Sequence, residues 1–143
     1  MNTNLGFCLA LHRAHASVQL KLDDELGLHH GISFNDFALL NLLAQADGAR
    51  VSIAELVRPL GQPQSAVLRQ LIVLEKIGLV MREGANGSRQ AVLRPAGRAL
   101  VNAARESADS ICTEAVASIA PEAVGMVCAA LVTLACTPTL VRS

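Results

Sequence analysis

The chain has 143 residues, a length typical of one domain, and 52% of them are hydrophobic, which is ample for a buried core. Aromatic residues make up only 2%, with no Trp or Tyr, so the core must consist of aliphatic side chains, which favours helices. The net charge is zero, and the longest apolar-rich run, 123–137, is shorter than the roughly 18 residues of a membrane span. No basic-then-apolar signal segment opens the chain, so we expect a cytoplasmic protein without membrane contact.

Two helices are predicted before residue 50. The first runs from about Leu5 to Leu26, because its apolar residues recur at helical spacing. Residues 27–31, which begin and end with glycine, are expected to break it and to leave two neighbouring histidines in an exposed loop. Ser33 and Asp36 form a capping box that opens the next, mostly buried helix.

Residues 52–78 carry two further helix patterns joined by a tight connection. Ser52 and Glu55 are spaced as a capping box, and the short helix they open ends at Gly61. The second helix is predicted over about 63–77, with one apolar stripe and a glycine after its last turn. Two short helices in this arrangement are typical of a helix-turn-helix, in which the second helix reads DNA.

A β-hairpin is predicted directly after these helices. Residues 79–83 and 89–93 have strand character, and 84–88 between them have the composition of a turn. The fold class is therefore mainly α with a small β-hairpin wing, a winged helix-turn-helix with additional terminal helices. We expect a single domain, 1–143, in which 32–98 form the winged module and 1–31 and 99–143 form a helical dimerisation part.

Positive charge is concentrated in the winged module. Residues 50–98 contain eight arginine and lysine residues and three glutamates, a net charge of +5, whereas the segments before and after carry −3 and −2. Attraction to phosphates acts over about a Debye length of 8–10 Å, so a local excess can act in a neutral molecule. This pattern favours nucleic-acid binding over the alternative, a merely solvated surface.

The C-terminal third predicts two helices that are too apolar to be solvated on all their free faces. Pro95 starts a long helix that is expected to reach about Ile119, and Pro121 starts the last one. We expect these helices, with the first helix of the chain, to make a homodimer. The alternative is a three-helix core within one chain.

Short motifs along the chain resemble those of the MarR family of bacterial transcriptional regulators, and the likeness extends over nearly the whole length. They are Leu60-Gly61, Ser65, Val67, Arg69, Leu74-Glu75-Lys76, Gly78-Leu79-Val80, Arg89 and Pro95-Ala96-Gly97, together with Leu11-His12-Arg13-Ala14 and Phe37-Ala38-Leu39-Leu40. The resemblance implies an obligate homodimer that binds pseudo-palindromic double-stranded DNA, usually as a repressor. It also implies release from DNA on meeting a small ligand or an oxidant. No cofactor is expected.

Polar side chains on the second helix of the module and at the hairpin are candidates for DNA contact. They are Gln62, Gln64, Ser65, Arg69, Gln70 and Arg89. Gln pairs with adenine and Arg with guanine in the major groove, although Arg69 could equally be a structural ion-pair partner. The apolar residues Leu68, Ile72 and Val73 on the same helix support an alternative function. This alternative is a dimeric winged-helix interaction or sensor protein with weak or lost DNA binding.

The first helix carries a candidate sensing face. Cys8, His12 and His15 are spaced i, i+4 and i+7 and therefore fall on one side of a helix. The segment around Cys8 is similar to the cysteine-bearing first helix of organic-peroxide sensors of the same family, which implies redox or ligand sensing. Interface packing and metal binding are the alternatives. The four cysteines contain no CxxC metal pair, and their spacing does not indicate a disulfide framework.

No catalytic motif stands out. The sequence contains no Ser-His-Asp order, Gly-rich phosphate loop or HExxH pattern, so we expect no enzyme activity and no catalytic residues.

Overall fold

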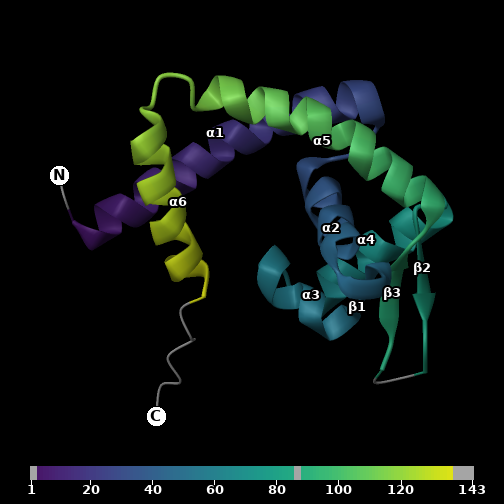
Figure 1. Ribbon diagram of the computed structural model, residues 1–143. Coiled ribbons are helices and arrows are strands. Elements are labelled where there is room, and N and C mark those ends of the chain that lie inside the picture. The colour runs from purple at the N-terminus through teal and green to yellow at the C-terminus, as the bar shows by residue number, and fades with distance from the viewer. Residues whose placement is uncertain (1–2, 86–87, 137–143) are drawn as a thin grey trace, which may run out of the picture.

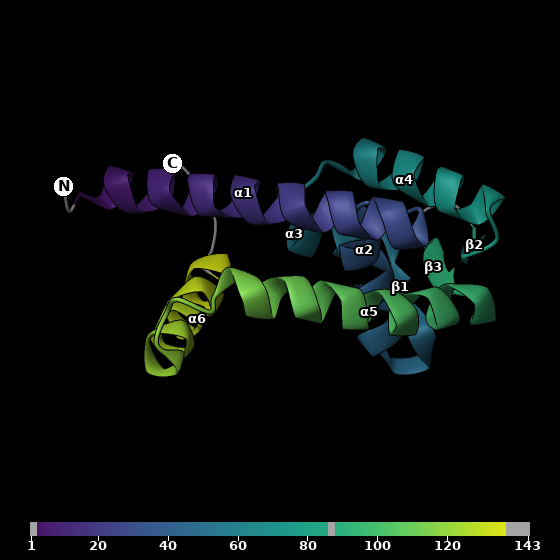
Figure 2. The ribbon, with the colours of Figure 1, turned by 90° about the horizontal axis from the view of Figure 1, so that it is seen from above.

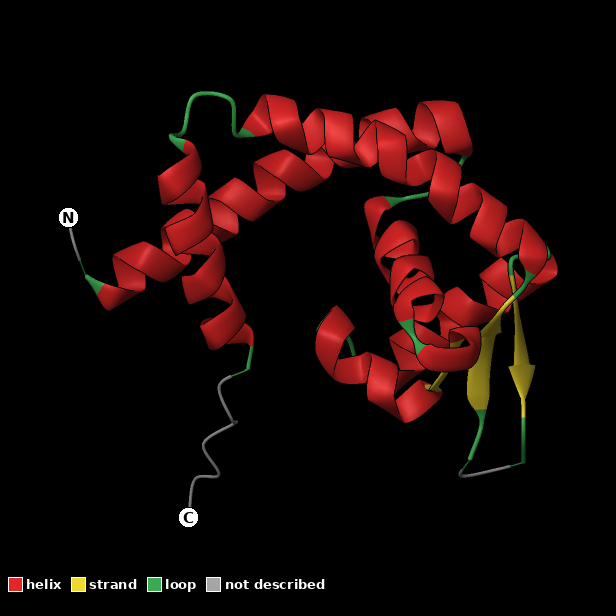
Figure 3. Cartoon of the chain, in the orientation of Figure 1, coloured by secondary structure: helices red, strands yellow, loops and turns green. Residues whose placement is uncertain are grey.

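The computed structural model describes residues 3–85 and 88–136, which form mostly helix with three short strands at one end of the molecule (Figure 3). The helices are α1 (Asn4–His30), α2 (Phe34–Gln45), α3 (Ile53–Leu60), α4 (Gln64–Lys76), α5 (Pro95–Ala115) and α6 (Pro121–Ala135). The strands are β1 (Arg50–Ser52), β2 (Val80–Glu83) and β3 (Gln90–Leu93), and a 3-10 turn, η1 (Asp47–Ala49), precedes β1. The predicted class, mainly α with a small wing, is confirmed.

The sheet is larger than the predicted hairpin by one strand. Its order is β1-β3-β2, and both neighbouring pairs are antiparallel. β2 and β3 form the expected hairpin, in which Glu83 lies opposite Gln90 at the end next to the turn. In the added pair, Val51 of β1 lies opposite Ala91, which is fully buried. β1 was missed because three residues are too few to show the alternation of a strand.

The first helix is longer than predicted, and the break expected at 27–31 was wrong. α1 continues through Gly27 to His30 and ends only at Gly31, whose φ of 69° lies in the left-handed region that favours glycine. Gly27 remains helical because Leu26 beside it is fully buried and packs this turn onto the core. Such packing outweighs the roughly 1 kcal/mol that an interior glycine costs a helix.

The two histidines expected in an exposed loop therefore lie on the last turn of α1, and both have partners. His29 Nε2 lies 3.1 Å from a carboxylate oxygen of Glu25 one turn earlier. His30 Nε2 lies 2.9 Å from Ser107 Oγ, so the end of α1 is linked to the middle of α5. The Glu25–His29 spacing permits a contact only once the helix continues through Gly27, and the contact with Ser107 is too distant in sequence to be predicted.

Helix starts in the winged module follow the predicted caps. Ser33 accepts a hydrogen bond from the amide of Asp36, whose carboxylate accepts one in return, so the capping box at α2 is complete. Ser52 accepts from the amide of Glu55 at 3.3 Å and caps α3. These bonds satisfy amides that a helix start otherwise leaves unpaired.

One aliphatic core joins the winged module to the pair of helices formed by α1 and α5. α5 packs antiparallel against the C-terminal half of α1 and also covers α2 (Figures 1 and 2). Each fully buried aliphatic side chain contributes roughly 1.5–3 kcal/mol. The largest of them are Leu22, Leu26, Leu39, Leu40, Leu43, Leu56, Val67, Leu71, Leu74, Val80 and Val101.

A glycine sets how closely α5 approaches the sheet. At Gly97, in the first turn of α5, an added Cβ would overlap the carbonyl oxygen of Leu79 and lie 2.6 Å from Leu93 Cδ1. The predicted proline start of this helix is confirmed, but the helix ends at Ala115, before the predicted Ile119.

The last helix contributes nothing to the core. α6 buries none of its residues, although it is the most apolar helix of the chain. Figure 1 shows it crossing the N-terminal half of α1, at the side of the molecule opposite β2 and β3. An apolar cleft of about 250 Å³ lies between them, lined by Phe7, Ala10, Leu11, Ala14, Val127 and Leu131. The alternative of a three-helix core within the chain is therefore wrong for α6.

Candidate nucleic-acid interface

The predicted reader helix, α4, is anchored on one face and free on the other. Val67, Leu71 and Leu74 are buried against the core. Because a helix turns once every 3.6 residues, Ser65, Arg69, Ile72 and Lys76 follow one line on the opposite face, with Val73 beside it. Of these, Ser65, Arg69, Val73 and Lys76 are exposed and Ile72 is half-buried. We call these five residues the outer face of α4.

The other predicted reader residues differ in their surroundings. Gln64 and Ser65 are exposed in the first turn of α4, and Gln62 is half-buried in the connection before it. The Gln70 side chain is held in place instead, because its amide nitrogen donates a 3.0 Å hydrogen bond to Asp36 Oδ1 of α2. The sequence offered no signal for this contact, which gives Gln70 a role in holding α4 on α2.

The wing is fixed to α4 by an ion pair that the sequence did not reveal. Arg82 of β2 holds Glu75 of α4, with Nη2 at 3.1 Å and Nε at 3.3 Å from Oε1. The backbone amide of Arg82 donates to Oε2 at 2.9 Å. These hydrogen bonds lower the pKa of Glu75, to which the charges of Arg82 and Arg89 add. The carboxylate therefore stays ionised in this setting.

A second ion pair lies at the end of the sheet next to the hairpin turn. Arg50 Nη1 of β1 lies 3.3 Å from Glu83 Oε2 of β2 and 3.5 Å from Gln90 Oε1 of β3. Two of the three glutamates in the module are thus neutralised by partners, as are two of its arginines. The net positive charge of the module is therefore carried by the arginine and lysine residues outside these two ion pairs.

Three of those cations border the outer face of α4. Within the ranges the structure describes, the side chains of Arg69, Lys76 and Arg89 make no hydrogen bond or ion pair. All three are exposed, and the carbonyl of Arg89 accepts a 3.1 Å hydrogen bond from the amide of Ile53. The start of β3 is thereby tied to the start of α3. This arrangement offers exposed, unpaired positive charge on and beside α4, as binding to a phosphate backbone requires.

The candidate sensing face lies at the other end of the molecule. Cys8, His12 and His15 are exposed on the N-terminal half of α1. They do not line the apolar cleft between α1 and α6, which uses a neighbouring face of the helix. In the part of the chain that is described, no three His, Cys, Asp or Glu side chains are grouped as metal ligands.

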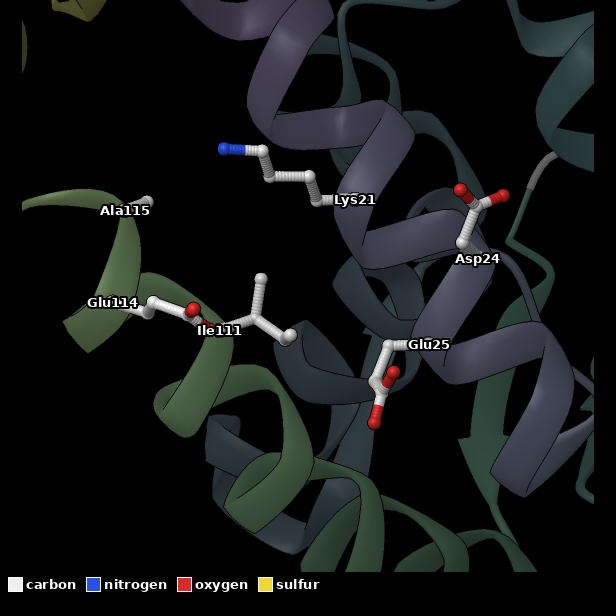
Figure 4. Close-up of a pocket in the computed structure, with 6 residues that line it drawn as sticks. All are labelled: Lys21, Asp24, Glu25, Ile111, Glu114 and Ala115. Atoms are coloured by element: carbon white, nitrogen blue, oxygen red, sulfur yellow. The ribbon is translucent and has the colours of Figure 1, made fainter.

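A charged cleft that sequence reading did not identify lies between α1 and α5. Its volume is about 290 Å³, and Figure 4 shows Lys21 and Glu25 extending from α1 and Ile111 from α5. Asp24, Glu114 and Ala115 complete its lining. A molecule bound there would contact both long helices, although the carboxylate of Glu25 already lies beside His29. Among the described residues, no helix combines the length and apolar character needed to cross a bilayer.

Comparison with known proteins connects this geometry to a family. The IclR helix-turn-helix domain model matches residues 37–84, which span α2 to the end of β2. No curated protein matches the sequence.

Solved structures match over almost the whole chain. A MarR family regulator from Rhodococcus sp. RHA1 superposes with a TM-score of 0.85 at 20% identity, covering 96% of this chain and 99% of that one. Sco3205 from Streptomyces coelicolor, a MarR family regulator solved in complex with DNA, gives 0.82 at 20% identity over 94% and 88%. Rv2887 from Mycobacterium tuberculosis, of the same family and solved with p-aminosalicylic acid, gives 0.71 at 26% identity over 92% and 98%. The chain thus has the winged helix-turn-helix fold of the MarR family transcriptional regulators, which confirms the family resemblance of its sequence.

Proposed function

We propose that this protein is a DNA-binding transcriptional regulator, a repressor that acts as a homodimer on a pseudo-palindromic operator. The observation that carries the proposal is the outer face of α4, where Arg69 and Lys76 are exposed and unpaired among the described residues. Arg89 supplies a third such cation at the wing. The DNA complex of Sco3205, which shares the fold, supports the same use of the module.

The homodimer follows from the uncovered apolar surface of the terminal helices. Large hydrophobic side chains are exposed at Leu5, Phe7, Leu9, Val116, Ile119, Met126, Val127, Val132 and Leu134. Exposed apolar side chains in such number mark a surface that contacts another protein, so we assign a second copy of the chain as their cover. In this proposal 1–31 and 99–143 form the dimerisation part. Two reader helices about 34–36 Å apart would then enter successive major grooves.

Release from DNA is proposed to follow a change in the spacing of the two readers. α1 and α5 connect the dimerisation part to the winged module, so a ligand or an oxidised side chain on either helix can alter that spacing. The complex of Rv2887 with p-aminosalicylic acid supports a small-molecule effector. For this chain we propose the Cys8, His12 and His15 face as the sensing region, by oxidation or by ligand binding.

Selection of bound sequences from a random DNA pool, followed by fluorescence anisotropy with the selected duplex, tests the proposed function. We expect nanomolar to micromolar binding that weakens with added salt. Arg69→Ala should reduce affinity at least tenfold. Arg105→Ala removes the same charge from α5, across the molecule from α4 in Figure 2, and should have little effect. If no duplex is selected, or if both variants bind like the parent protein, DNA binding through α4 is refuted.

The second candidate is a dimeric winged-helix interaction or sensor protein that has lost DNA binding. It is favoured by one observation: Val73, in the middle of the outer face of α4, is an apolar side chain with 59% exposure. A folded dimer that selects no DNA in the experiment above would support this candidate.

A further inference from the structure

The outer face of α4 carries two apolar side chains that the core does not use. Val73 is 59% exposed and Ile72 is half-buried. In the part of the chain that is described, the partly buried hydrophobic residues packed on the core include Leu68 but neither Ile72 nor Val73. Both side chains can therefore be reached by another molecule, and the meaning of their exposure has to come from the residues around them.

Their neighbours indicate what kind of molecule that is. Arg69 lies one turn before Ile72 and Val73, and Lys76 lies one turn after them, so the apolar pair is flanked by cations on both sides along the helix. Both cations are exposed, and neither side chain has a partner in the described chain. A partner that matches this face presents apolar groups between regularly spaced negative charges. The major groove of DNA does so, because the C5 methyl group of thymine is its apolar contact point between the phosphate strands.

We infer that Ile72 and Val73 read the methyl groups of thymines in the half-site, while Arg69 reads a guanine beside them. This inference rests on the proposed function and names the sequence class that the same surface recognises. Arg69 and Val73 are four residues apart, about 6 Å along the helix at 1.5 Å per residue. With base pairs about 3.4 Å apart, the thymine lies one or two base pairs from the guanine. In this inference Ile72 and Val73 contribute to the recognition of the DNA sequence.

Deoxyuridine provides a direct test, because it differs from thymidine only by lacking the C5 methyl group. A duplex selected from a random pool by the full-length protein is remade with each thymine of one half-site replaced singly by deoxyuridine. Fluorescence anisotropy then measures the affinity of every duplex. We expect one or two positions, next to an essential guanine, at which affinity falls about fourfold, the equivalent of about 0.8 kcal/mol for one buried carbon group.

Variants separate a methyl contact from an effect on DNA shape. Val73→Ala and Ile72→Ala should each lose the preference for thymidine over deoxyuridine at one position while still binding the duplex. Leu28→Ala, which shortens a 77% exposed aliphatic side chain on α1, should keep the full preference. Equal binding of thymidine and deoxyuridine duplexes by the parent protein would overturn the inference. So would a preference that survives in both α4 variants.

These results are distinguishable from a failure of the proposed function itself. Binding that still depends on Arg69, but without discrimination of the methyl group, refutes thymine reading and leaves DNA binding intact. Failure to select any duplex refutes both.

Discussion

Two guanidinium nitrogens of Arg82 in the wing donate to one carboxylate oxygen of Glu75 in α4, and the backbone amide of Arg82 donates to the other. The contact joins the element proposed to enter the major groove to the element that carries Arg89. Charge-assisted hydrogen bonds with this geometry are stronger than neutral ones and fix direction as well as distance. The contact therefore ties the reader helix directly to the wing.

Glu75→Gln tests this link through stability and its dependence on pH. The pKa of Glu75 is lowered from 4.5 by its hydrogen bonds to Arg82, so the ion pair stabilises the folded state above that pH. This stabilisation is lost as the pH falls below 4.5 and through the folded-state pKa. We expect Glu75→Gln to lower the free energy of unfolding by about 1 kcal/mol at neutral pH, because a partly exposed pair contributes little more. It should also flatten the acid decline of stability.

Urea unfolding at pH 7 and in mild acid measures both effects. Glu106→Gln is the matched control, since Glu106 is exposed on α5 and has no hydrogen bond or ion pair in the described structure. An identical pH profile for Glu75→Gln and the parent protein would mean that the contact with Arg82 does not stabilise the fold.

Arg89→Ala should weaken DNA binding in a different way from Arg69→Ala. Arg89 lies directly before β3, beside the hairpin turn and outside α4, so we expect it to contact the DNA backbone or the minor groove. Its removal should lower affinity evenly across sequences and reduce the slope of log affinity against log salt by about one. Arg69→Ala should also relax base preference. Titrations at several salt concentrations against the selected duplex and a scrambled one separate these patterns, and identical behaviour of the two variants would contradict the assigned roles.

The sequence predicted those parts of the fold that depend on residues close together in the chain, and it missed those that depend on residues far apart. Local signals were dependable: the serine caps of α2 and α3 and the proline start of α5 all appear as expected. Tertiary packing decided the errors, since buried Leu26 carries α1 past Gly27, and β1 exists only through its pairing with β3.

The candidate site shows the same contrast between local signals and contacts that are distant in sequence. The α4 residues were found from helical spacing, but their availability was not, because it depends on contacts distant in sequence. Gln70 is held by Asp36, 34 residues earlier, and Arg50 by Glu83, 33 residues later. Pairing of this kind cannot be read from a local pattern, whereas the unpaired state of Arg69 is visible only once the fold is known.

Gly97→Ala should be strongly destabilising. The added methyl group would overlap the carbonyl oxygen of Leu79, a backbone atom that cannot move without shifting the sheet. We expect a loss of roughly 1–3 kcal/mol, the usual cost of overpacking a core. Gly27→Ala, also within a helix but with no atom within 4 Å of the new methyl group, should stabilise by up to about 1 kcal/mol. Thermal unfolding of both variants checks the contrast, and equal melting temperatures would refute it.

Truncation after Ile119 should leave a folded monomer. All of the buried core residues lie before this point, the last being Ala108, and α6 buries none of its own. Removing α6 therefore takes away apolar surface that we assign to the second copy, but no part of the core. Sedimentation equilibrium should give the monomer mass while circular dichroism shows retained helix. A truncated protein that still sediments as a dimer would show that α6 is not needed for association.

The last prediction concerns control by oxidation. Among the described residues Cys8, Cys112, Cys128 and Cys136 are all exposed, so accessibility does not single out one of them. Cys112 is disfavoured, because partial burial and the nearby carboxylate of Asp109 raise its pKa, which leaves less thiolate to react at neutral pH. Cys8 lies on the long helix that joins the proposed dimer interface to the winged module, where an added polar group would disturb the packing of the two copies.

We therefore expect Cys8→Ser to retain the dimer and its DNA binding but to abolish release by peroxide, whereas Cys112→Ser should respond like the parent protein. If oxidation favours the non-binding spacing of the readers by about 3 kcal/mol, affinity falls roughly a hundredfold, which anisotropy resolves easily. Intact-protein mass spectrometry of the same samples would locate the oxidised residue. Undiminished peroxide sensitivity in Cys8→Ser would make Cys8 a packing residue, and the effector would then be sought as a non-covalent ligand beside His12 and His15.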